Sequence, residues 1–284
     1  MLPRKNPVFK ENVNASSEHP LKEFALLVAG VLLIAIVIIF AISIATRLFA
    51  TSIPFQWEVD VVETFDPEFI AQSQEIEISK QQALGQLVDK LVAKADLPEG
   101  MEIHPYLIHQ AEANAFATLG GNIFVADALI ANVSSENALS MVIAHELGHI
   151  YYRHPIQQFA SAASLQLAFT LIFGSENSFG QETLIGHSAG VATLSFGRDM
   201  EREADEFALS LLRKVYGHTY GAEEFFTYIQ SQHESDEHLL IYSSHPGTEE
   251  RIETIANAQK NDLAKPLVPM SSELKALVPE EESN

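Results

Sequence analysis

The longest apolar pattern in the chain runs from Phe24 to Thr46, where no charged residue interrupts it. About 20 apolar residues in a helix can span a bilayer, and the apolar part of a cleaved signal peptide is usually shorter. We therefore predict a transmembrane signal anchor over residues 23–47 rather than a core helix, although residues 43–45 leave cleavage open. Residues 1–22 then form a cytoplasmic N-terminal segment.

Basic residues around this apolar stretch predict its orientation. Four Lys or Arg residues lie within residues 1–22, whereas none occurs between Arg47 and Lys80. Loops rich in Lys and Arg stay in the cytoplasm, so the remainder of the chain is expected outside. In a bacterium this predicts a single-pass protein of the inner membrane with a periplasmic domain.

Shorter patterns predict the elements that follow. Alternating polar and apolar residues at 56–62 indicate a strand within a juxtamembrane connector, residues 48–79, where Trp57 could instead anchor at the membrane interface. Further segments have the spacing of an amphipathic helix at 81–94 and of strands at 103–108, 113–118 and 123–125. We expect a small antiparallel sheet, whose free edge could bind an extended peptide through main-chain hydrogen bonds.

The next helical pattern contains residues suited to metal chemistry. Ser134-Ser135 supplies N-cap residues, and apolar positions at helical spacing follow. Within this predicted helix, residues 145–149 read H-E-x-x-H. His145 and His149 lie one turn apart and can bind one zinc ion, while Glu146 can take a proton from a metal-bound water. A core helix with two hydrogen-bonded histidines is the alternative.

A catalytic zinc site needs a third protein ligand. Pro155 stands where a G-x-x-H continuation would place a histidine, so this ligand must come from elsewhere. The best candidate is the predicted helix at 198–208, where Glu201 and Asp205 lie one turn apart and small Ala204 allows another helix to approach closely. Glu201 could bind the metal while Asp205 orients a ligand histidine, although spacing alone suits a solvated acidic face equally well.

These motifs resemble the zinc metallopeptidase family of the CaaX prenyl endopeptidase and HtpX, and are closest in type to the periplasmic quality-control metalloproteases. The matching motifs are N-A-F-A with G-G-x-I-x-V at 114–125, H-E-L-G-H at 145–149, E-x-x-A-D at 201–205 and H-P-x-x-x-x-R-I at 245–252. They cover roughly residues 80–260. Gly197 is a departure, because the family often has Ser or Thr before the Arg of its third-ligand helix.

The resemblance implies a set of metal-site residues. His145, His149 and Glu201 would bind one zinc ion per chain, and Glu146 would be the general base. Asp205 would orient a ligand histidine. Another divalent metal in the same site stays open, because metal availability often decides occupancy.

The resemblance also implies a fold, a substrate site and an activity. The expected fold is α+β: a mainly helical, zincin-like peptidase domain over residues 80–260 with a small antiparallel sheet. His245 and Arg251 would lie near the substrate carbonyl, and Asn114 on the edge strand that pairs with the peptide. The implied activity is zinc-dependent hydrolysis of peptide bonds in proteins, in envelope protein quality control.

Three segments remain outside these motifs. Residues 156–173 are apolar but include three Gln, which favours a buried or membrane-facing helix over a second span. Residues 174–181 are predicted to form a loop that acts as a lid, and His187 after it is treated as an ordinary residue. Residues 261–284 contain Pro and end in an acidic run, so we predict a disordered tail there.

Composition narrows the function classes. The formal net charge of −21 argues against nucleic acid as a partner, and the absence of Cys excludes disulfides, thiolate zinc sites and a catalytic Cys. One alternative is a non-catalytic zinc-containing, chaperone-like scaffold, against which Glu146 argues because a structural site needs no base. The other is an intramembrane protease, against which the polar ends of the metal helix argue. The oligomeric state and the physiological substrate stay open.

Overall fold

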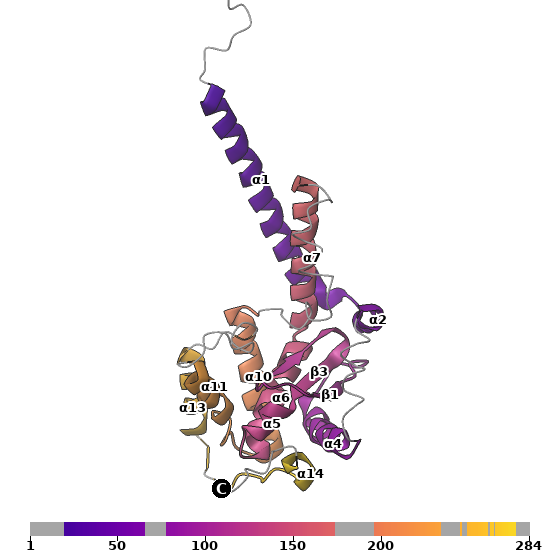
Figure 1. The fold of residues 1–284 in the computed structure, drawn as a ribbon, viewed down its shortest axis with the longest axis vertical. Helices are drawn as coiled ribbons and strands as arrows, with labels where there is room; N and C mark the ends of the chain where they lie inside the picture. Colours follow the sequence, from indigo (N-terminus) through magenta and orange to yellow (C-terminus); the bar gives the residue numbers. More distant parts are fainter. Residues whose placement is uncertain are drawn as a thin grey trace, which may run out of the picture.

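The computed structural model describes residues 20–65, 78–173, 196–233, 245, 249–260, 262–263 and 265–276. A long apolar helix, α1 (Pro20–Phe49), projects from a domain that is mostly helical and contains a small sheet (Figure 1). The predicted lid at 174–181 and His187 lie outside the described residues.

Helix α1 contains the predicted anchor. Among the described residues, one helix is long and apolar enough to cross a membrane; its span is Leu21–Ile42, and none of that span is buried inside the chain. A short turn, η1 (Ala50–Ser52), connects α1 to α2 (Phe55–Phe65). The strand predicted at 56–62 is therefore wrong. The buried residues Glu58 and Val62 are four apart and share one face of α2, so a short alternating pattern concealed a helix with one buried face.

Three short strands form the sheet in the order β1 (His104–Ile108), β3 (Asn122–Ala126) and β2 (Ala115–Ala117). β1 is parallel to β3, and β2 is antiparallel to β3, so the sheet is mixed rather than wholly antiparallel as expected. The chain passes from β1 across to the far side of β3, which leaves β2 as an edge strand. A short turn, η2 (Leu119–Gly121), joins β2 to β3. Gly121 is required there, because its φ is +79° and an added Cβ would lie 2.0 Å from the Glu102 carbonyl oxygen.

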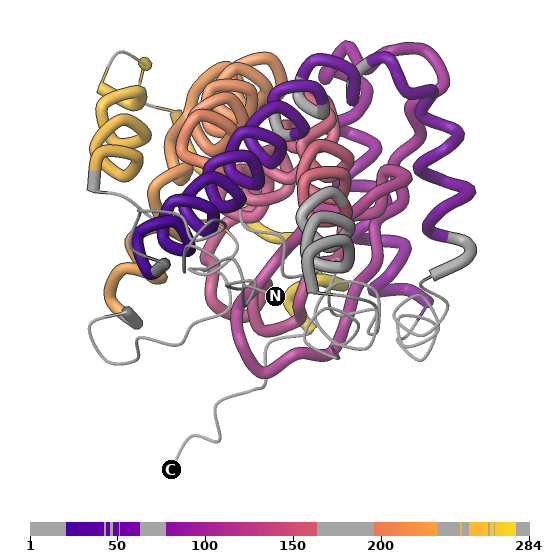
Figure 2. The backbone as a smooth tube through the Cα atoms, turned by 90° about the horizontal axis from the view of Figure 1, so that it is seen from above, coloured from indigo at the N-terminus to yellow at the C-terminus, as the bar shows by residue number. Residues whose placement is uncertain are grey.

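The helices α4 (Ile78–Ala95), α5 (Asp127–Ala131) and α6 (Glu136–Tyr151) pack against this sheet. The other helices of the domain are α7 (His154–Phe173), α10 (Arg198–Tyr216), α11 (Glu224–His233) and α13 (Glu249–Lys260). The helices predicted over 81–94, in the metal motif and at 198–208 are α4, α6 and α10. α6 is buried on all sides, with β2 and β3 on one side and α10 on another, and α13 flanks α10 on its outer side (Figure 2).

The C-terminal segment is folded in its described part, which corrects the prediction of a disordered tail for residues 262–263 and 265–276. Pro269 forms a β-bridge with Ser135, and the short helix α14 (Ser272–Lys275) packs against α4. Met270 and Leu274 are buried in the main core. Val268 adds backbone hydrogen bonds to Glu136 and to the Asn137 side chain, so the segment is held by partners that are distant in sequence.

Candidate metal centre and active site

Helix α6 brings two histidines onto one face. Ser135 caps the helix by accepting a hydrogen bond from the Ala138 N–H at 3.2 Å. One turn apart near the other end, His145 and His149 are 4% and 0% exposed. Their Nε2 atoms lie 3.0 Å apart and point toward a common centre.

Helix α10 adds a carboxylate to this centre. The two Glu201 oxygens lie 3.4 Å from His145 Nε2 and 3.5 Å from His149 Nε2. The helices can approach closely because Gly148 faces Ala204: an added Cβ on Gly148 would lie only 2.9 Å from Ala204 Cα. The small residue predicted to allow a close helix contact is therefore at the contact itself.

The spacing of these donor atoms fits a bound zinc ion. In a tetrahedral site, ligand atoms 2.0–2.1 Å from the metal lie about 3.3 Å from one another. The two Nε2 atoms are 3.0 Å apart, and the Glu201 carboxylate lies 3.4 Å from one of them through Oε2 and 3.5 Å from the other through Oε1. Two imidazole nitrogens and one carboxylate are also a donor set that zinc prefers. His145, His149 and Glu201 could therefore hold the ion.

Surrounding residues fix the orientation of both imidazoles. Asp205 Oδ1 lies 2.9 Å from His145 Nδ1, on the side of the ring away from Glu201. His154, at the start of α7, lies 2.9 Å from His149 Nδ1. Arg251 on α13 donates two hydrogen bonds to Asp205, of 2.7 and 2.9 Å, and its Nη1 lies 2.6 Å from Glu201. This arrangement matches the outer-shell support that metal-binding histidines usually have.

Glu146 lies beside the histidine cluster and is 1% exposed. Its Oε2 accepts a hydrogen bond of 2.8 Å from the N–H of Ala117, in edge strand β2. Burial raises the pKa of the Glu146 carboxyl, although the positive charges of His245 and His145 oppose the shift. A raised pKa suits a carboxylate that must accept a proton and return it.

His245 belongs to the same cluster. His145, His149, Glu201 and His245 each offer a ligand atom, and these atoms lie within 4.8 Å of one another. His245 Nδ1 is 3.1 Å from Glu201, whereas its Nε2 is buried, lies 3.5 Å from Glu146 and has no hydrogen-bond partner in the described part of the chain. The structure thus groups His245 with the expected ligands.

The charges in the cluster are unequally distributed. Burial opposes protonation of His145, but hydrogen bonds to Asp205 and Glu201 outweigh it and raise the pKa of His145 to about 9. Burial lowers the pKa of His149 well below its ordinary value. Burial would raise the pKa of Glu201, but the charges of His245 and His145 hold it far below the usual range. Glu201 is therefore ionised, as a metal ligand must be, whereas His145 has to release its proton to bind a metal.

Comparison with known proteins identifies the family. Residues 79–259, more than half of the chain, match peptidase family M48. The chain belongs to peptidase family M48. The resemblance to the zinc metallopeptidases of this type is thereby confirmed, and the grouped residues offer a site for the metal on which such peptidases depend.

Several curated relatives are 26–30% identical to the chain over the residues that align. The beta-barrel assembly-enhancing protease of Escherichia coli (strain K12) is 28% identical over 185 residues, covering 60% of this chain and 37% of that protein. Mitochondrial metalloendopeptidase OMA1 of Schizosaccharomyces pombe is 28% identical over 155 residues, which cover 54% of this chain and 45% of that protein. A protease HtpX homolog of Ralstonia pickettii is 28% identical over 220 residues, covering 63% of this chain and 75% of that protein. The chain spans about a third of the length of the beta-barrel assembly-enhancing proteases.

Asn114 lies immediately before β2 in this M48 domain. Its backbone oxygen accepts a hydrogen bond of 2.9 Å from the Ala126 N–H, which continues the pairing of β2 with β3. Asn114 is 7% exposed, and within the described residues its Oδ1 has no hydrogen-bond partner. The structure thus places Asn114 at the end of the edge strand that also contacts Glu146 through Ala117.

Sequence reasoning missed two residues at the M48 centre. His154 contacts His149 and also lies 3.1 Å from Glu203. Phe196 stacks on the His149 ring with centroids 3.9 Å apart. The His-Pro pair after the helix was a signal for the first, but its contact depends on a backbone reversal at Arg153, where φ is +60°. Phe196 offered no signal in the sequence.

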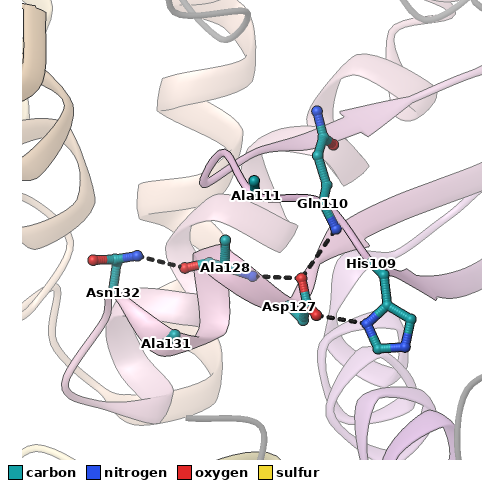
Figure 3. A pocket seen from close by; sticks show the side chains of 7 residues that line it. All are labelled: His109, Gln110, Ala111, Asp127, Ala128, Ala131 and Asn132. Atoms are coloured by element: carbon teal, nitrogen blue, oxygen red, sulfur yellow. Dashed lines mark hydrogen bonds and ion pairs between the residues drawn. The ribbon is translucent and has the colours of Figure 1, made fainter. Parts of the chain in front are cut away.

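A separate open hollow of about 430 Å³ lies between the loop after β1 and helix α5 (Figure 3). His109 lies in its wall with Nδ1 2.7 Å from Asp127 Oδ2, and Asp127 also accepts a hydrogen bond from the Gln110 N–H. None of the eight predicted site residues lines this hollow. It is therefore not part of the M48 centre.

Proposed function

We propose that the chain is a membrane-anchored, zinc-dependent endopeptidase that hydrolyses peptide bonds of proteins. The observation that supports this best is the position of Glu146. This buried carboxylate lies against the histidine cluster on one side and is bound to the edge strand β2 on the other. A purely structural zinc site would not need a base in that place.

His145, His149 and Glu201 would hold the zinc ion in this proposal. Bound zinc would supply a Lewis acid that polarises a carbonyl and makes a water molecule nucleophilic at neutral pH. Asp205 and His154 keep the two imidazoles turned toward the centre through their Nδ1 atoms. The ligands are therefore positioned before any ion arrives, which limits the entropy cost of binding.

Glu146 would act as the general base. It takes the proton from the attacking water and passes it to the nitrogen of the leaving amine. The Ala117 N–H occupies Oε2, so Oε1 is the oxygen that remains for the water proton. Oε1 is also the oxygen that faces His245, at 3.5 Å.

The substrate would pair with strand β2. Hydrogen bonds from Thr118 to Asn122 and from Ala126 to Asn114 show that alternate residues of this segment face β3. In an antiparallel ladder the intervening residues, Ala115 and Ala117, direct their backbone groups to the other side. An extended peptide at that edge would lie next to Glu146, which already holds the Ala117 N–H. Asn114 Oδ1, which has no hydrogen-bond partner among the described residues, would accept a hydrogen bond from the peptide backbone.

His245 and Arg251 take different roles in this proposal. His245 Nε2, which is buried and has no hydrogen-bond partner among the described residues, would donate to the oxygen that becomes negatively charged in the transition state. Arg251 is occupied by Asp205 and Glu201. We therefore assign it to positioning these two carboxylates rather than to contact with the substrate carbonyl, where the resemblance had placed it.

The location and biological role follow from the anchor and the relatives. The apolar span in α1 and the basic residues before it support insertion in a bacterial inner membrane with the domain in the periplasm. The names of relatives refer to assembly of β-barrels and to HtpX. Envelope protein quality control is the role that we propose on this basis, with proteins or peptides as substrates.

The test compares metal binding and casein cleavage in full-length, detergent-solubilised variants. Glu201→Gln should lose most bound zinc and with it the activity. Glu206→Gln makes the same change at an exposed position of α10 and should keep both. A chelator should abolish wild-type cleavage and added zinc should restore it. Full zinc occupancy in Glu201→Gln would remove this residue from the site, and zinc binding without cleavage in the wild type would favour a scaffold.

A further inference from the structure

Helix α7 lies beside α1, and both project from the same side of the domain (Figure 1). The two helices run in opposite directions and are joined at their bases by a small apolar cluster. Ile156 and Phe159 from the first turns of α7 pack there with Ala50 and Ile53, just after α1. The ring of Trp57 lies 6.5 Å from that of Phe159 in an edge-on contact.

A stripe along α1 shows how far this contact extends. Within residues 31–42, only Ala35, Ile39 and Ile42 are partly buried, and the rest are exposed. Their spacing of four and three residues places them on one face of the helix. Among the described helices α7 has the most extensive contact with α1, so we assign this stripe to the face that α7 covers. α7 therefore reaches the level of residues inside the apolar span of α1.

The depth of α7 follows from helix geometry. Both helices rise by about 1.5 Å per residue, so in an antiparallel pair each residue further along α7 lies level with one residue further back along α1. Since Ile156 lies near Ala50, the level of Ile42, where the apolar span begins, corresponds to about residue 164 of α7. The remaining turns, up to Phe173, are then level with the apolar span for about 15 Å.

We propose that helix α7 enters the hydrocarbon of the bilayer beside α1, with its last turns at the depth of the lipid acyl chains. The whole of α7 contains no Asp, Glu, Lys or Arg. A depth of about 15 Å is half of the apolar thickness of a bilayer, so α7 enters one leaflet and does not cross. Lipid would surround this part of α7, because the membrane that surrounds α1 continues around the helix beside it.

This placement has a consequence for the site. Only Tyr152 and Arg153 separate α6 from α7. Arg153 is tied to the segment after α1 by hydrogen bonds to Ile53 O at 3.0 Å and to Glu58 Oε1 at 2.7 Å. The helix that carries His145 and His149 is therefore held at a fixed height above the membrane from two sides.

The test uses the single Trp of the chain. Trp57→Phe removes it, and one Trp is then introduced at Leu167, Phe169 or Leu171 in the full-length protein. Each variant is reconstituted in phosphatidylcholine vesicles with or without brominated acyl chains, which quench Trp fluorescence on contact. Trp at Val37, an exposed position in the span of α1, gives the full quenching, and Trp at Leu263, which is 82% exposed on the domain, gives the baseline.

At least one of the three α7 positions should be quenched as strongly as position 37, because three nearby positions sample different faces of the helix. Quenching at the baseline level in all three would overturn the proposal and place α7 in water or against protein. The measurement needs no catalytic activity, so it can fail while the proposed function stands, and the reverse also holds. The melting temperature of Trp57→Phe shows whether the background variant is folded.

Discussion

Gly148→Ala should weaken metal binding by separating the helices that carry the ligands. Gly148 lies between His145 and His149 on α6, and it faces Ala204 between Glu201 and Asp205 on α10. The added Cβ would lie 2.9 Å from Ala204 Cα and 3.1 Å from its carbonyl oxygen. Both are backbone atoms of α10, so no side-chain rotation relieves the contact.

The size of the effect follows from this contact. An ordinary Cβ contact is 3.4–4 Å, so α10 must move by at least about 0.5 Å, the difference between 3.4 and 2.9 Å. Zinc sites tolerate errors of about 0.2 Å in ligand distance. We expect zinc affinity to fall about 10- to 100-fold, as it does when ligand orientation is disturbed. Overpacking costs about 1–3 kcal/mol, and Ala recovers about 1 kcal/mol of helix propensity.

The assay measures zinc affinity by competition with a chelating dye and thermal unfolding in the absence of metal. Gly85→Ala is the matched control, since it makes the same change within a helix, α4, and its Cβ would meet nothing within 4 Å. That variant should bind zinc normally and gain up to about 1 kcal/mol of stability. If Gly148→Ala bound zinc like the wild type and melted no lower, close packing of α6 on α10 would not position the ligands.

Two further predictions concern the packing around the centre. Arg153→Met should destabilise the fold by about 3–5 kcal/mol, because it leaves Glu58 buried and unpaired, and Glu58→Gln in the same chain should recover part of the loss in a urea titration. If the double variant were no more stable than the single one, the buried pair would not explain the loss. Leu274→Ala in the C-terminal segment should cost about 2–5 kcal/mol, whereas Leu263→Ala, at a position 82% exposed, should cost almost nothing. If Leu274→Ala and Leu263→Ala had equal melting temperatures, the C-terminal segment would contribute no stability to the fold.

Local periodic signals were the ones that could be read from the sequence. The N-cap at Ser135, the helical spacing of the metal motif and the small residue Ala204 each depend on neighbours within a few positions. These signals placed two ligand candidates on one helix and the third on another. The pairing of the two helices itself came from the resemblance, because no spacing rule connects residues 145 and 201.

Other features depend on contacts between distant residues. The buried face of α2 exists because Glu58 meets Arg153 and the Gly120 N–H, which a pattern of alternating residues cannot reveal. The sheet is mixed because the chain crosses from β1 to the far side of β3, a choice that short strands do not encode. The described part of the C-terminal segment is ordered by burial of Met270 and Leu274 and by backbone pairing with the start of α6, whereas its prolines and acidic end predicted the opposite.

The rate of the Glu146→Gln variant tests the central proposal most directly. The full-length protein is loaded with zinc, the metal content is measured, and cleavage of casein is compared with that of the wild type. Because Glu146 is assigned to proton transfer, the variant should keep about one zinc per chain and lose at least about 100-fold in cleavage rate. Cleavage at the wild-type rate by the zinc-loaded variant would contradict the assignment of Glu146 as the base.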